Sequence, residues 1–342
     1  MTRGAAVLAC ALVLAACARG PAQPADAPVL VSDGRYAMGT VLELTLLAPD
    51  EARGRALAEQ AFATAAQLEA LLTNWEASSA LMRLNAAAGQ GPQDVDPELA
   101  RVLAASKEFT RRTRGAFDIT VGPLVELWRT AGQRNELPSA AARAGALAAV
   151  GADGLRVDLD ASTAELVSPG ARLELGGIAK GWALDRIAEA LRAAGIRSAL
   201  LSFGQSSVWA IGAPPGEAGW RLLVRTPAGG YAGIATLRDR ALSVSGSVGQ
   251  GIEIAGHRYG HVLDPRTGAP LQHAAQAVVL APTAAWAEAL SKALLVLPPA
   301  EGIALLDASR DRAGLLLEAD GQRHESRGWA EAARFEPAAP GP

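Results

Sequence analysis

Cysteine is nearly absent from this chain of 342 residues. The two cysteines are Cys10 and Cys17, so no disulfide can cross-link the body of the protein. The same scarcity, together with the absence of an HExxH motif, argues against a zinc site. Lysine is also scarce, because only Lys107, Lys180 and Lys292 occur among 32 basic residues. Each of the three lysines is therefore a candidate for a specific role as a cation.

An excess of positive charge is missing as well. The 32 basic and 35 acidic side chains leave a formal charge of −3, whereas a protein that neutralises nucleic-acid phosphates needs a basic surface. The composition therefore indicates no nucleic acid as a partner. Half of the residues are apolar and 20% are charged, which is typical of a globular protein with a sizeable core.

The N-terminal segment predicts export from the cytoplasm. An apolar run over residues 5–16 follows Arg3 and is too short to span a bilayer permanently. Residues 14–17 read LAAC and resemble a bacterial lipobox, which predicts a signal peptide over residues 1–16 and a diacylated Cys17. Cleavage near Ala16 without lipidation is the alternative. A lipidated chain would be anchored to the membrane on its periplasmic side.

Composition divides the remaining chain into three parts. Residues 17–30 are rich in Pro, Ala and Gly and predict a flexible tether. Residues 31–336 form the expected domain, and residues 337–342 form an expected disordered tail. No internal repeat occurs.

Hydrophobic periodicity predicts strands interleaved with helices. The interleaving has no regular βαβ period, so we expect an α+β fold with mixed sheets. The expected strands lie at residues 42–46, 172–175, 199–203, 208–211, 221–224, 233–237, 277–280 and 315–317. The expected helices lie at residues 57–72, 97–114, 178–194, 284–297 and 299–308.

Two segments concentrate groups that could carry chemistry. Residues 175–181 (LGGIAKG) place a glycine pair at a strand-to-helix junction with Lys180 in the first helical turn. Free N–H groups and a cation at a helix start suit a phosphate, although a glycine pair taken alone more often forms only a tight turn. Residues 261–268 (HVLDPRTG) bring His261 next to Asp264 and Arg266. This turn predicts either proton transfer beside a phosphate or a surface ion pair.

Serine hydrolysis is a weaker interpretation. Ser206, Ser245 and Ser247 are candidate nucleophiles, but none lies in a GxSxG motif.

Five stretches, in this order along the chain, resemble the ApbE family of FAD:protein FMN transferases. The resemblance extends from about Tyr36 to Ala308. The matching stretches are residues 36–40 (YAMGT), 73–85 (TNW followed by Ser79 and RLN), 115–124 (GAFDITVGPL), 175–185 and 261–268.

The resemblance implies a single ApbE-type domain that binds FAD and passes FMN to a Ser or Thr hydroxyl of an acceptor protein, releasing AMP. The acceptor is expected to be a membrane or periplasmic redox subunit. By motif match, His261 is the expected general base. The residues expected to contact the flavin nucleotide are Met38, Trp75, Ala116, Phe117, Asp118, Glu174, Lys180 and Val262.

The resemblance breaks at the metal site. The family places Asp and Thr four residues apart on a helix as Mg²⁺ ligands, aided by a backbone carbonyl near Gly177. This chain has Glu288 and Lys292 at those positions. Glutamate can still bind Mg²⁺, but an ammonium has no lone pair and repels a cation. The metal positions therefore correspond to Gly177, Glu288 and Lys292, with Mg²⁺ dependence expected to be weak or lost.

Two arrangements of Glu288 and Lys292 are open. The spacing allows a solvated ion pair worth about 0.2 to 0.5 kcal/mol. It also allows the Lys292 ammonium to take the place of the metal and face the diphosphate. The chain is accordingly expected to be a divergent FMN transferase, with a non-catalytic FAD-binding lipoprotein and a pyrophosphatase that splits FAD into FMN and AMP as the alternatives.

Overall fold

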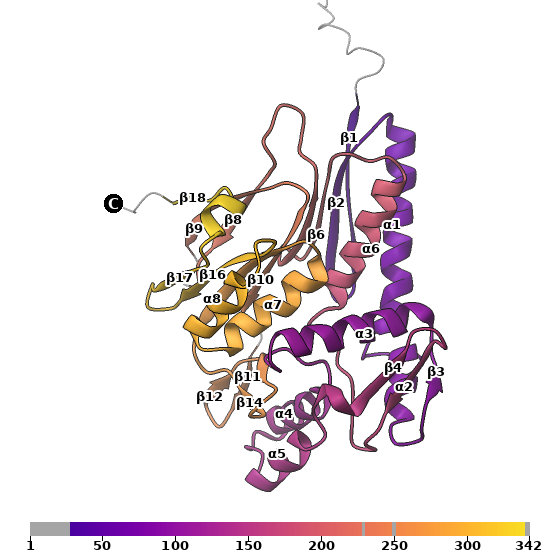
Figure 1. Ribbon diagram of the computed structural model, residues 1–342, viewed down its shortest axis with the longest axis vertical. Helices are drawn as coiled ribbons and strands as arrows, with labels where there is room; N and C mark the ends of the chain where they lie inside the picture. The colour runs from indigo at the N-terminus through magenta and orange to yellow at the C-terminus, as the bar shows by residue number, and fades with distance from the viewer. Residues whose placement is uncertain (1–27, 228–229, 248–250, 339–342) are drawn as a thin grey trace, which may run out of the picture.

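An antiparallel sheet of eight strands forms the centre of the computed structural model, which describes residues 28–227, 230–247 and 251–338 (Figure 1). The strand order is β1-β2-β6-β7-β10-β15-β16-β17. Its members are β1 (Val29–Ala37), β2 (Thr40–Ala48), β6 (Ala199–Phe203), β7 (Ser207–Ile211), β10 (Arg240–Gly246), β15 (Ala275–Ala281), β16 (Ala313–Glu318) and β17 (Arg323–Glu325).

Four helices cover one face of this sheet, α1 (Glu51–Leu72), α6 (Ala179–Ala193), α7 (Ala284–Val296) and α8 (Pro299–Asp307). Helix α7 packs on β10 and β15, and α6 lies between α1 and α7. Asp50 caps α1 by accepting a hydrogen bond from the Arg53 N–H over 2.7 Å. Alanine and leucine fill the buried side of α7, which is the most apolar of these helices.

A smaller sheet and a short helix cover the opposite face. They are β8 (Trp220–Arg225), β9 (Tyr231–Leu237), β18 (Glu336–Pro337) and α9 (Trp329–Ala332). Side chains of β15 alternate between the two cores, since Ala277 and Val279 join the helical side while Val278 and Leu280 join Trp329 on the other. The central sheet is therefore buried on both faces.

The remaining elements gather at one end of the sheet, in the lower part of Figure 1. They are α2 (Ala80–Ala86), β3 (Gln93–Asp94), α3 (Pro97–Arg112), α4 (Gly122–Arg134), α5 (Ala140–Leu147), a 3₁₀ turn (Ala152–Gly154), β4 (Leu155–Asp158), β5 (Thr163–Leu166), β11 (Ile252–Ile254), β12 (His257–Tyr259), β13 (Leu263–Asp264) and β14 (Ala269–Pro270). Helix α3 starts as expected, with Asp96 accepting from the Glu98 N–H over 2.7 Å.

The α+β class is confirmed, and the named strand pairs are antiparallel because hairpins connect many of them. Two predicted boundaries change. Val29 and Leu30, in the expected tether 17–30, pair with β2, and Pro337, in the expected tail, pairs with Gly233. Backbone pairing at these strand ends offsets the loss of chain freedom. The predicted signal peptide and Cys17 lie outside the described residues.

Candidate functional site

The segment before the glycine pair is not the strand predicted for residues 172–175. It forms an isolated parallel bridge to Val121, with the Glu174 N–H donating to the Ile119 carbonyl (2.7 Å) and the Gly122 N–H to the Arg172 carbonyl (3.2 Å). Two asparagine side chains bond to other groups of its backbone. The Leu173 N–H donates to Asn85 Oδ1 over 2.7 Å, and the Leu173 carbonyl accepts from the amide groups of Asn85 (3.0 Å) and Asn74 (2.8 Å). Asn74 Oδ1 also accepts from the Leu175 N–H over 3.2 Å. Asparagine carries both a donor and an acceptor, so two of them can satisfy the backbone groups of Leu173 and the N–H of Leu175.

A cleft opens beside this segment, where the β1–β2 turn approaches the end of α1 and the start of α6. It brings together four of the predicted nucleotide-binding residues, Met38, Trp75, Glu174 and Lys180. Met38 and Gly39 form a two-residue hairpin turn with φ of 51° and 78°, and such turns need positive φ at both positions. The Trp75 side chain is 83% exposed. An exposed indole and a cation thus share one opening.

Two of the three lysines of the chain belong to this region. Lys180 and Lys292 are half-buried, and neither ammonium has a hydrogen-bond or ion-pair partner among the described residues. Burial lowers the pKa of Lys292 to about 8, a shift that Glu288 opposes, Lys180 strengthens and Glu174 opposes. Both charges are therefore available to an anion from outside the chain at neutral pH.

Glu174 is the acidic group whose charge acts on Lys180 and Lys292. Burial raises the pKa of its carboxyl group, while the Gly176 N–H, Lys180 and Lys292 oppose that shift. The Gly176 N–H donates to Glu174 Oε1 over 2.9 Å. This bond holds the carboxylate against the glycine turn at the start of α6.

Close packing of α6 on α7 fixes where the charges of the two helices meet. A Cβ atom at Gly181 would lie 2.5 Å from the Ala284 carbonyl oxygen, so only glycine allows this approach. Asp185, on the next turn of α6, accepts from the N–H groups of Ala284 (2.7 Å) and Ala285 (2.9 Å), and from Trp209 Nε1 (2.8 Å). One carboxylate therefore ties the start of α7 to α6 and β7.

Glu288 and Lys292 do not form the solvated ion pair that their spacing allows. Glu288 is completely buried, and its Oε1 accepts a hydrogen bond from the Ser207 hydroxyl. Its second oxygen, Oε2, is buried without a hydrogen-bond partner. No ion pair joins Glu288 and Lys292 among the described residues, although Glu288 does act on the Lys292 charge.

The residues at the family's metal positions do not fit Mg²⁺. Mg²⁺ requires near-octahedral oxygen coordination. Here Glu288 offers one buried unpartnered oxygen, and the ammonium of Lys292 is itself a cation. No group of three or more His, Cys, Asp or Glu residues is placed to hold a metal ion in the part of the chain that the structure describes. The third position, Gly177, lies in the glycine turn.

His261 lies in the connection between β12 and β13. Partial burial, then the charges of Lys292 and Lys180, lower the pKa of its imidazole. A neutral imidazole can accept a proton, so the two lysines favour the form that a general base needs. Val262 is half-buried against the main core, and its carbonyl accepts from the Leu271 N–H over 2.9 Å.

Asp264 and Arg266 pair with each other, as one of the two alternatives for this turn predicted. Arg266 Nε donates to Asp264 Oδ1 and Arg266 Nη2 to Asp264 Oδ2, both over 2.9 Å. This two-bond geometry uses the guanidinium fork and both carboxylate oxygens. The pair shapes the turn after His261.

Ala116, Phe117 and Asp118 are buried behind the glycine turn and do not line the cleft. A Cβ atom at Gly177 would lie 3.4 Å from the Phe117 ring. Asp118 Oδ1 accepts from the Thr120 N–H (2.8 Å) and hydroxyl (2.7 Å). Burial raises the pKa of Asp118, and the bonds from Thr120 oppose that shift. In this conformation the three residues support the turn from behind.

The hydroxyl groups considered for serine hydrolysis have structural partners. Ser245 shares a hydrogen bond with Ser291 over 2.8 Å, Ser247 Oγ accepts from the Ala275 N–H over 2.9 Å, and Ser206 Oγ donates to the Phe203 carbonyl over 3.2 Å. These bonds tie strands and turns together and do not activate a nucleophile.

Sequence reasoning missed the structural roles of Asn74, Asn85 and Asp185. All three lie within the motifs of the resemblance, but the backbone groups that they bond lie 88 to 101 residues further along the chain. Polar residues inside apolar surroundings are the only signal available from the sequence, because a buried polar group needs a partner.

Comparisons with known proteins identify the family of this chain. The model of the ApbE family matches residues 38–316. An FAD:protein FMN transferase of Klebsiella pneumoniae is 33% identical over 306 residues, covering 86% of each chain. One of Rhodobacter capsulatus is 34% identical over 298 residues, covering 84% of this chain and 55% of the relative.

Solved structures show the same fold. The ApbE protein of Thermotoga maritima superimposes with a TM-score of 0.80 at 26% identity, covering 90% of this chain and 100% of that one. The apo flavinyl transferase ApbE of Pseudomonas stutzeri gives a TM-score of 0.79 at 27% identity, covering 90% and 98%. With the matching motifs, the shared fold and these relatives together, the chain belongs to the ApbE family.

Proposed function

We propose that this chain transfers FMN from FAD to a Ser or Thr hydroxyl of an acceptor protein and releases AMP. Its relatives from Klebsiella pneumoniae and Rhodobacter capsulatus carry this activity in their names. The observation that carries the proposal is the pair of unpartnered lysines, Lys180 and Lys292, beside a cleft rimmed by Trp75. Lys180 in the first turn of α6, with the charge of Lys292 from α7 close enough to act on it, suits a diphosphate, and an exposed indole suits an aromatic ring system.

The transfer exchanges one bond to phosphorus for another. The acceptor hydroxyl oxygen forms a bond to the phosphorus atom of the FMN half. The bond from that phosphorus to the bridging oxygen breaks, and AMP leaves with the oxygen. His261 takes the hydroxyl proton, while Lys180 and Lys292 stabilise the negative charge that grows on the diphosphate.

Lys292 supplies in this chain the charge that a metal supplies in the family. The ammonium is held next to the buried Glu288, and burial with these neighbours sets its pKa at about 8, so it is charged at neutral pH. One positive charge stabilises the leaving phosphate less than two. We therefore expect slow transfer with weak Mg²⁺ dependence.

AMP release measured with EDTA and with excess Mg²⁺ tests this role. We expect rates within about threefold of each other, and a metal stimulation of a hundredfold or more would overturn the role of Lys292. The double variant Lys292→Thr with Glu288→Asp should gain Mg²⁺ dependence. Glu288→Asp alone is the matched control, because it keeps the ammonium and should stay insensitive to Mg²⁺.

The same assay separates the other activities. Incubation with FAD and a candidate acceptor should leave covalent flavin fluorescence on the acceptor. Release of free FMN without acceptor would instead support a pyrophosphatase, and unaltered FAD that copurifies with the chain would support a non-catalytic binding protein. The misfit to Mg²⁺ is the observation that favours the binding protein as the second candidate.

We further propose that the chain works on the periplasmic side of a bacterial membrane, held by lipid on Cys17. The apolar run and the LAAC letters support this. Within the described residues no helix is long and apolar enough to cross a bilayer. The variant Cys17→Ser should move from the membrane fraction to the soluble fraction, and unchanged fractionation would contradict the anchor.

A further inference from the structure

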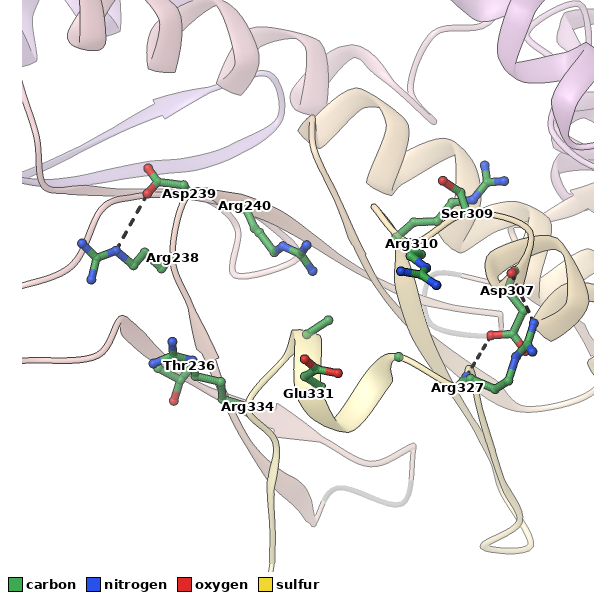
Figure 2. A pocket seen from close by; sticks show the side chains of 13 residues that line it. Thr236, Arg238, Asp239, Arg240, Asp307, Ser309, Arg310, Arg327, Glu331 and Arg334 are labelled. Atoms are coloured by element: carbon green, nitrogen blue, oxygen red, sulfur yellow. Dashed lines mark hydrogen bonds and ion pairs between the residues drawn. The ribbon is translucent and has the colours of Figure 1, made fainter.

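A cleft lined by arginine lies apart from the nucleotide site. It measures about 870 Å³ and carries six arginines against three carboxylates. Its walls are the β9–β10 turn, the connection from α8 to β16, and the segment around α9 (Figure 2). An 870 Å³ cleft has the size of a site for a small organic molecule rather than for a single inorganic ion.

Two of the three carboxylates are already used by the protein. Asp307 accepts from the backbone N–H of Arg327 (2.8 Å) and from its Nε (3.3 Å). Asp239 accepts from Arg192 over 3.1 Å and from the Gly212 N–H over 3.0 Å. Arginine therefore remains in excess within the cleft.

The excess lies on Arg240, Arg310 and Arg312, of which Arg312 lies over the Trp286 ring (5.6 Å to the centroid) and has a buried Nε without a partner among the described residues. Arg240 Nη1 is buried without a hydrogen-bond partner, and the Arg310 guanidinium has no partner among the described residues. Figure 2 shows both side chains reaching into the space from different walls, Arg240 from β10 and Arg310 from the α8–β16 connection. The buried Nη1 of Arg240 without an acceptor costs free energy, and an oxyanion removes that cost, whereas the exposed Arg310 adds its charge.

The third carboxylate narrows the class of ligand. Glu331 of α9 lies in the same cleft, is exposed, and has no ion-pair partner among the described residues. A ligand with negative charge alone would be repelled by Glu331, whereas a ligand hydroxyl can donate to it. The side chains around it are charged or small, and none of the described residues that line the cleft is an aromatic one that could stack on a base.

We propose that this cleft binds a phosphorylated polyol, such as a glycerol or sugar phosphate. The guanidinium groups of Arg240 and Arg310 would hold the phosphate oxygens, since arginine matches them with paired hydrogen bonds. Glu331 would accept from a ligand hydroxyl. Free phosphorylated polyols and the headgroups of phosphatidylglycerol share this chemistry.

The cleft is separate from the nucleotide site. Arg240 begins β10, whereas Ser245, near the other end of that strand, bonds to Ser291 of α7, the neighbour of Lys292. Five residues of strand separate the two ends by about 16 Å. In addition, Arg327, Glu331 and Arg334 lie beyond the region that the ApbE family model matches.

Calorimetric titration of the full chain with glycerol 3-phosphate, and flotation with phosphatidylglycerol vesicles against phosphatidylcholine vesicles, test the proposal. The double variant Arg240→Gln with Arg310→Gln should bind about tenfold or more weakly. The matched control is Arg55→Gln with Arg101→Gln, which removes equal charge from ion pairs on the helix surface, and it should bind as the original chain does. Arg310→Glu, at an exposed position, repeats the test with little risk to folding.

The two binding assays distinguish a free phosphorylated polyol from a lipid headgroup. Saturable binding of glycerol 3-phosphate in solution supports a free ligand, and binding to phosphatidylglycerol vesicles alone supports a headgroup. Glu331→Gln should reduce the preference for glycerol 3-phosphate over inorganic phosphate. Equal losses in the double variant and its control, no binding to either probe, or binding of an acidic peptide alone would overturn the proposal.

Discussion

The two clefts of this protein place positive charge by different means. At the nucleotide cleft two lysines stand on helices whose positions are fixed by short backbone contacts, through Gly181 and Asp185. At the other cleft arginines reach inward from three surface segments (Figure 2). Burial tunes a lysine, as the pKa of about 8 for Lys292 shows, whereas arginine stays charged. Anion binding at the nucleotide cleft thus depends on the accurate placement of two lysines. Anion binding at the arginine cleft depends on the summed charge of its arginines.

Of the substitutions that separate the two clefts, His261→Ala has the largest expected effect, and it acts on transfer at the nucleotide cleft. Loss of a general base lowers transfer by about 10² to 10⁴-fold, so AMP release in the presence of acceptor should fall by that factor. Binding of glycerol 3-phosphate to the arginine cleft should not change. His257→Ala, on the exposed strand β12, is the control, and an equal loss of rate there would remove His261 from its role.

Asp185→Ala tests how far the nucleotide cleft depends on its scaffold. The substitution leaves buried donors of Ala284, Ala285 and Trp209 without an acceptor. The free energy of unfolding should fall by about 3 kcal/mol, measured by urea denaturation. At temperatures where the variant stays folded, FAD affinity should fall while the arginine cleft keeps its ligand. Parallel losses at both clefts would show that the two sites share one support.

Asp185 also predicts a dependence on pH. Burial raises its pKa to about 6 from the ordinary 3.8, so the folded chain holds this proton more tightly than the unfolded chain. The stabilisation is complete below pH 4 and is lost as the pH rises through 6. Relative to Asp185→Asn, which does not titrate, the original chain should lose up to about 3 kcal/mol of unfolding free energy over that interval. A flat difference between the two proteins would argue against the raised pKa.

Gly181→Ala should have a smaller effect. Its new methyl group would lie 2.5 Å from the Ala284 carbonyl oxygen, so α6 and α7 must move apart at a cost of about 1 to 3 kcal/mol. Thermal unfolding and FAD titration measure the two consequences. Gly145→Ala in α5 is the matched control, because its methyl group would meet nothing within 4 Å and should leave stability equal or slightly higher.

The sequence predicted elements with strong local patterns and missed arrangements that depend on distant partners. The alternating leucines of β2 and the apolar stripe of α1 occur where expected. The segment 172–175 was predicted as a strand, yet it forms an isolated bridge to Val121, and Asn74 and Asn85 bond to its remaining backbone groups. No local spacing reveals such contacts.

The candidate site was predictable in part for the same reason. Motif matches led to Met38, Trp75, Glu174 and Lys180, which the fold brings to one cleft. The burial of Glu288 beside Ser207 could not be foreseen, since i,i+4 spacing alone suggests a solvated pair. The arginine cleft could not be predicted from the sequence, because its lining residues come from separate segments between positions 236 and 334.

The exposure of Trp75 allows ligand binding at the nucleotide cleft to be followed by tryptophan fluorescence. The chain has seven tryptophans, and Trp75, at 83% exposure, is the one that opens widely to solvent. Oxidised flavins absorb where indoles emit, so a flavin docking at this rim quenches that emission. Fluorescence titration of the unlabelled protein thus reports occupancy, and Trp75→Phe is the reference that gives the emission of the other six tryptophans.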